Sequence, residues 1–153
     1  MAFLSAFLLG LVAGLRSMLG PAAVSWAAHL GILHVDGTSL AFMDWPYTRF
    51  VLTALALGEL IADKTPFVPS RKSPLPFIGR IITGSLTGAT IGASVHSLVG
   101  CAVLGAVGAV AGTMGGAVVR AQVAKMFGRD LPAAFAEDLS ALLIIALCFV
   151  ALR

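Results

Sequence analysis

The sequence has few charged residues. Of its 153 residues, 11% are charged and 59% are hydrophobic, whereas a soluble domain has about 25% charged residues. A globule built from this chain would have too little polar surface to cover it in water. The composition therefore excludes an ordinary soluble domain and predicts an integral membrane protein whose outer solvent is lipid.

The chain also lacks the short motifs of common catalytic sites. It contains no phosphate-binding loop and no GxSxG, HExxH or CxxC sequence. Cys101 and Cys148 lie inside apolar runs and lack metal-ligand spacing. We therefore predict no metal, no cofactor, no catalytic residue and no nucleic-acid partner, and membrane lipids as the expected partners.

Apolar segments fill most of the chain. A helix needs about 20 apolar residues to cross the hydrocarbon core, and five segments approach that length. They cover residues 2–33, 47–62, 77–98, 99–119 and 132–152. The predicted fold is all-α: one integral membrane domain over residues 1–153 that forms a bundle of about five spans.

Loop charges predict the orientation of this bundle. Basic residues follow the second predicted span (Lys64, Arg71, Lys72 and Arg80) and the fourth (Arg120, Lys125 and Arg129), whereas the loop over residues 34–46 carries only acids. Lys and Arg favour the cytoplasmic side. Alternating crossings then place the N-terminus inside and the C-terminus outside.

Arg16 lies at membrane depth in the first segment, about 20 Å along it if the helix starts near Ala2. Gly14 and Gly20 flank it, and Pro21 cannot donate a backbone hydrogen bond. This pattern predicts a helix that is broken or kinked near residues 16–21. Transporters place substrate sites at such breaks. The alternative is a kinked helix in which Arg16 pairs with one acid for packing, and the segment either crosses once or is re-entrant.

Charged residues from other predicted helices are available as partners for Arg16. Glu59 and Asp63 stand four apart and share a helix face, while Glu137 and Asp138 open the fifth span. Buried charges need partners. We therefore predict a polar cluster for transport or binding that consists of Arg16, Ser17, Glu59, Asp63, Lys64, Arg80, Glu137 and Asp138. The alternative for Glu137 and Asp138 is stabilisation of the positive end of a helix dipole.

The third and fourth predicted spans carry glycines along one face. They are Gly84, Gly88 and Gly92 in one span and Gly105, Gly108 and Gly112 in the other. Small residues at this spacing let helix backbones approach closely in lipid. We expect the two stripes to face each other, or one to face a second copy of the chain in a homo-oligomer. Alternatively, the glycines line a narrow path for a solute.

Four motifs, in order along nearly the whole chain, resemble those of the family called domain of unknown function 4126. They are residues 14–17 with Pro21, residues 59–66, Arg80 with Gly84 and Gly88, and residues 137–138 with the apolar tail. The resemblance implies a small polytopic protein of the bacterial inner membrane. It implies no established chemistry.

Three functional hypotheses follow. The first is a transporter or permeation protein of unknown solute, in which Glu59 carries a proton and Arg16 contacts an anion or acts as a gate. The second is a structural or accessory membrane subunit. The third is a lipid-handling enzyme, because the acids and cations from Glu59 to Arg80 lie near one predicted membrane surface.

Overall fold

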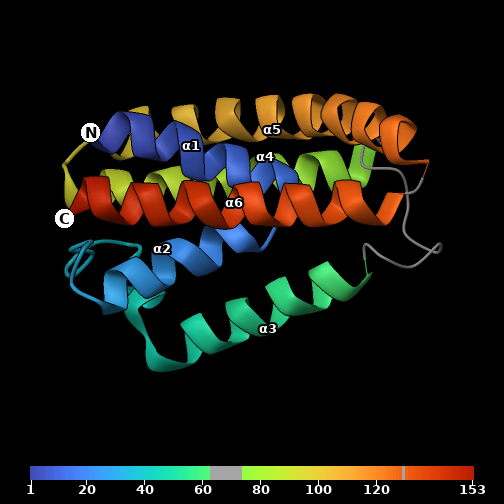
Figure 1. The fold of residues 1–153 in the computed structure, drawn as a ribbon. Helices are drawn as coiled ribbons and strands as arrows, with labels where there is room; N and C mark the ends of the chain where they lie inside the picture. The colour runs from blue at the N-terminus through green and yellow to red at the C-terminus, as the bar shows by residue number, and fades with distance from the viewer. Residues whose placement is uncertain (63–73, 129) are drawn as a thin grey trace.

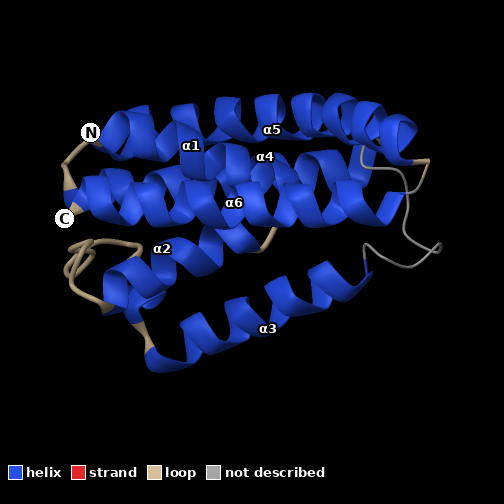
Figure 2. Ribbon diagram, viewed as in Figure 1, coloured by secondary structure: helices blue, strands red, loops and turns tan. Residues whose placement is uncertain are grey.

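Helices make up nearly all of the computed structural model, which describes residues 1–62, 74–128 and 130–153 (Figure 2). The helices are α1 (Ala2–Leu15), α2 (Leu19–His29), α3 (Pro46–Ala62), α4 (Pro74–Ser94), α5 (Leu98–Phe127) and α6 (Asp130–Leu152), with a 3₁₀ turn over Ala41–Asp44. Gly128 ends α5 in the left-handed conformation, at φ 65°. The predicted all-α class is confirmed for the described residues.

The first segment turns back on itself instead of continuing in one direction. Between α1 and α2, Arg16 has an extended backbone. Gly20 of α2 lies against Leu9 and Ala13 of α1, whereas a continuous helix would hold residues 9 and 20 about 16 Å apart. The two helices therefore form a hairpin whose tip is residues 16–18 (Figure 1).

This reversal changes the position of the chain ends. Both termini lie at the same end of the bundle (Figure 1), whereas alternating crossings predicted termini on opposite sides. The α1–α2 hairpin returns the chain to the end of the bundle at which it begins (Figure 1). Pro21 is the third residue of α2, and a first-turn amide has no partner within its own helix. Pro21 is therefore compatible with the start of a new helix.

The described helices differ from the five predicted spans. Two of them, over Leu98–Met126 and Pro132–Leu152, are long and apolar enough to cross a membrane. α1 is apolar but has 14 residues, and α3 has 17. Arg80 and several glycines and threonines make α4 less apolar than α5 and α6.

α1, α4 and α5 pack almost backbone to backbone at the centre of the bundle. A Cβ atom added at Gly88 of α4 would overlap the carbonyl oxygen of Cys101 in α5, and one at Gly105 would overlap that of Gly84. Gly92 lies against the start of α5. These positions leave no room for one methyl group, so the glycines here pack helices and do not line an open path.

The glycine stripe of α5 contacts two neighbouring helices. Gly105 faces α4, whereas Gly108 and Gly112 lie against the backbone of α1 at Phe7 and Leu11. The expectation that the two stripes face each other therefore describes only part of the α5 stripe. Because the other glycines of this stripe contact α1, the hairpin is held close to α5 along most of its first helix.

Candidate functional site

The carbonyl end of α1 is covered by a buried cation. Arg80 of α4 is 4% exposed, and its Nη1 atom donates to the carbonyl oxygen of Gly14 at 2.7 Å and to that of Leu15 at 3.4 Å. The hydroxyl of Thr113 also donates to the Gly14 oxygen, at 3.0 Å. The last carbonyls of a helix lack intrahelical donors and carry partial negative charge. Arg80 therefore satisfies this helix end and offsets its dipole.

The amide end of α2 is covered by a carboxylate from another helix. The backbone amides of Ser17 and Met18 donate to the two carboxylate oxygens of Glu59, at 2.8 and 2.9 Å. No local side chain caps α2, so Glu59 of α3 takes that role at the positive end of the helix dipole. Arg80 Nη2 lies 3.9 Å from the same carboxylate, which joins the two helix ends electrostatically.

Arg16 forms an ion pair at the tip of the hairpin. Its side chain is 1% exposed, and its Nε and Nη2 atoms lie 2.9 and 2.7 Å from Oδ1 of Asp138 on α6. The carboxylate of Glu59, which the sequence offered as another partner, instead binds the neighbouring backbone amides. Arg16 thus connects the hairpin tip to α6.

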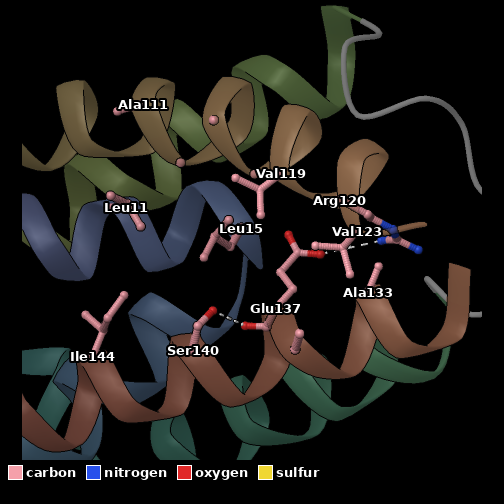
Figure 3. Close-up of a pocket in the computed structure, with 14 residues that line it drawn as sticks. Leu11, Leu15, Ala111, Val119, Arg120, Val123, Ala133, Glu137, Ser140 and Ile144 are labelled. Carbon is pink, nitrogen blue, oxygen red and sulfur yellow. Dashed lines mark hydrogen bonds and ion pairs between the residues drawn. The ribbon is translucent and has the colours of Figure 1, made fainter. Parts of the chain in front are cut away.

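Glu137, which precedes Asp138 in α6, faces a different cation. The carboxylate of Glu137 lies 3.6 Å from Nη1 of Arg120 on α5, as the close-up shows (Figure 3). Because α6 begins at Asp130, Glu137 and Asp138 lie about two turns inside the helix. The dipole effect falls off within the first turn, so the helix-dipole alternative for these two acids is wrong.

The structure brings three guanidinium groups and three carboxylates from α3, α4, α5, α6 and the hairpin tip together in three pairs of opposite charge. They are Arg16, Arg80, Arg120, Glu59, Glu137 and Asp138. We call these six residues the tip cluster. Its formal charges cancel. Ser17 contributes a backbone amide, Gly14 a carbonyl oxygen and Gly20 a close contact. Asp63 and Lys64 lie outside the described residues.

Sequence reasoning placed Arg120 in a loop and overlooked Thr113. One signal for Arg120 was present, because Gly112, Gly116 and Arg120 are four apart and therefore share one face of α5. Thr113 carried no comparable signal. Among the described residues, no three His, Cys, Asp or Glu side chains are placed to hold a metal ion.

The fold and the tip cluster define the class of this molecule: an all-α bundle in which a helical hairpin ends in a neutral group of buried and partly buried charges. A model of the family described as Domain of unknown function (DUF4126) matches residues 3–151. The chain therefore belongs to this family, as its motifs predicted. Comparison with curated proteins and with solved structures found no match for the chain.

Proposed function

We propose that the chain is an integral membrane protein in which α3, α4, α5 and α6 cross the bilayer and the α1–α2 hairpin is re-entrant. The distribution of side chains supports this placement. Buried positions are rich in alanine and glycine, whereas large apolar residues such as Ile61, Leu147 and Val150 are about 70% exposed. Exposing apolar area to water costs about 25 cal/mol per Å², a cost that lipid removes.

The charge distribution supports one orientation of this bundle. Lys125 lies in the last turn of α5, at the end away from both termini (Figure 1). In the sequence, further basic residues at positions 64, 71, 72 and 129 occur between α3 and α4 and between α5 and α6. The positive-inside rule places this end in the cytoplasm. The termini then lie on the opposite face, and the membrane is the inner membrane of a bacterium.

In this membrane arrangement, the protein is a small transporter or permeation protein whose binding centre is the tip cluster. The observation that carries this proposal is the helix break itself. Two half-helices meet inside the bundle, and their free ends are held by Glu59 and Arg80 from other helices. Discontinuous helices with their ends at a polar site are the usual substrate-binding arrangement of secondary transporters.

At this site a small anion can take the place of the Glu59 carboxylate at the amide end of α2. Ionised Glu59 accepts hydrogen bonds from the amides of Ser17 and Met18. Once protonated, the carboxyl has no charge and one of its oxygens becomes a donor, so its hold on the helix end weakens. The positive end of α2, beside Arg80, is then available to an anionic solute. Proton uptake and anion binding are thereby linked.

The test is flux into liposomes that contain the purified chain. We expect chloride or phosphate uptake that depends on a pH gradient and exceeds uptake by empty vesicles. Glu59→Gln removes the group that takes up the proton, so flux should no longer respond to the pH gradient. Arg16→Ala removes a charged contact worth about 1.5–3 kcal/mol, which lowers flux about tenfold or more. Asp36→Asn removes an exposed acid from the loop after α2 and leaves flux unchanged.

A structural or accessory membrane subunit is the competing role, because each charge of the tip cluster lies near an opposite charge. That role predicts a different pattern in the same experiment. Wild-type flux would equal that of empty vesicles, while Glu59→Gln would still lower the melting temperature of the purified protein. This outcome rejects transport and assigns the cluster to assembly of the fold.

A further inference from the structure

A groove runs along one side of the bundle between α1, α5 and α6 (Figure 3). Its volume is about 360 Å³, within the range of roughly 300–1,000 Å³ for small-molecule sites. Leu11 and Leu15 of α1 form its floor, and Val119 and Ala136 on its walls are exposed. The groove is therefore apolar and opens sideways, toward the lipid tails of the proposed membrane.

One end of the groove carries charged side chains. Arg120 and Glu137 lie there as a pair, with Nη1 and Oε2 3.6 Å apart. Glu137 is 8% exposed, whereas the side chain of Arg120 is 16% exposed. Lys125, in the last turn of α5, is exposed and lies beyond the residues that line the groove. Arg120, Lys125 and Glu137 together carry a net charge of +1, which favours an anion near this end of the groove.

We infer that this groove binds one acyl chain of an anionic membrane lipid, with the acidic head group beside Arg120 and Lys125. The inference rests on the membrane placement proposed above and not on solute movement. An apolar channel that ends at cations near the basic face matches the order of tail and head group in such a lipid. Basic pockets on the cytoplasmic side recognise anionic head groups in the same manner.

The dimensions of the groove favour a hydrocarbon chain over a helix of a second copy. A helix with its side chains is about 10–12 Å across and rises 5.4 Å per turn, so a single turn already occupies more volume than the whole groove provides. A free anion would gain nothing from the apolar walls. A second cavity of about 390 Å³, between α2, α3 and α6, is lined by no charged residue within the described chain and offers no head-group site.

The groove exists because α5 presents small residues to it. A Cβ atom added at Gly115 would meet nothing within 4 Å, so a leucine at this position projects into the groove without overlapping protein. Gly79 of α4 is a matched control, because a Cβ atom there also meets nothing within 4 Å and Gly79 does not line the groove.

The experiment is native mass spectrometry of the full chain in detergent. The probes are phosphatidylglycerol and phosphatidylcholine with identical acyl chains. We expect one retained phosphatidylglycerol per chain and a preference over phosphatidylcholine of about fivefold, since a basic residue near a lipid surface contributes roughly 1 kcal/mol. Gly115→Leu should lower phosphatidylglycerol retention at least about fivefold, and Gly79→Leu should leave it unchanged.

Each other result has a defined meaning. Equal retention of the two lipids overturns the head-group assignment, and unchanged retention in a folded Gly115→Leu variant overturns the groove assignment. Release of the chain from membranes by alkaline carbonate overturns this inference together with the membrane placement. Absence of liposome flux with the lipid preference intact rejects only the transport proposal.

Discussion

Arg16 and Asp138 are 122 positions apart in the sequence and form an ion pair at the hairpin tip, with Nε and Oδ1 2.9 Å apart. The guanidinium is 1% exposed and the carboxylate 14%. This pair fixes the tip of the hairpin against α6, which borders a cavity on each of two sides. The position of α6 therefore depends on charge as well as on apolar packing.

Asp138→Asn should strongly destabilise the protein. The variant keeps the shape of the side chain but removes the negative charge that faces the buried Arg16. Breaking a buried ion pair by removing one partner costs about 3–5 kcal/mol. Thermal unfolding of the purified chain in detergent measures the loss as a lower melting temperature.

The double variant Arg16→Met with Asp138→Leu serves as the partner experiment. Replacing both charges by apolar groups leaves no uncompensated charge, so stability should recover partly or fully. Asp36→Asn, in an exposed loop, should change the free energy of unfolding by no more than about 0.5 kcal/mol. Equal melting temperatures for wild type and Asp138→Asn would show that the pair contributes no stability.

Alanine substitutions at two helical glycines of α4 should have opposite effects. In Gly88→Ala the new methyl group overlaps the Cys101 carbonyl oxygen, and the forced separation of α4 from α5 costs about 1–3 kcal/mol. In Gly79→Ala the methyl group meets no other atom within 4 Å, and the substitution stabilises the helix by roughly 0.5–1 kcal/mol. Melting temperatures of the two variants test this; a shift of the same sign in both would contradict the close packing of α4 on α5.

The sequence was sufficient to predict helices, the break near Arg16 and most members of the tip cluster. Long apolar runs require helices, and a charge within such a run requires a partner. The reversal at the tip was not predictable, because hydropathy is the same for a bent crossing and for a hairpin. Arg16 pairs with Asp138 and not with Glu59 because of how α3 and α6 are rotated about their axes. The spacing of residues in the sequence does not determine that rotation.

Glu59→Gln should loosen the amide end of α2. A glutamine side chain replaces one of the two carboxylate oxygens with an amino group, which cannot accept the hydrogen bond that this oxygen now receives from Ser17 or Met18. Loss of a hydrogen bond to a charged group costs about 1.5–3 kcal/mol, which corresponds to exchange about tenfold or more faster at these amides. Hydrogen–deuterium exchange of a peptide over residues 16–20 measures this.

Two comparisons make the exchange experiment specific. Peptides from the middle of α5 should exchange at the wild-type rate in Glu59→Gln, because the variant leaves the glycine contacts between α5 and its neighbours in place. Asp36→Asn should leave all of these rates unchanged. Equal exchange of residues 16–20 in wild type and Glu59→Gln would show that the α3 carboxylate does not hold the hairpin tip.

The hairpin predicts that both termini lie on one membrane face. An impermeant maleimide should label an added N-terminal cysteine and Arg153→Cys from the same side, since α1 and α2 add no net crossing. Met126→Cys, at an 82% exposed position near the basic end of α5, should be labelled only from the other side, the cytoplasm. Cys101 and Cys148 are buried and give a low background. Labelling of the termini from opposite faces would require the first segment to cross the membrane once, which is incompatible with contact between Gly20 and Leu9.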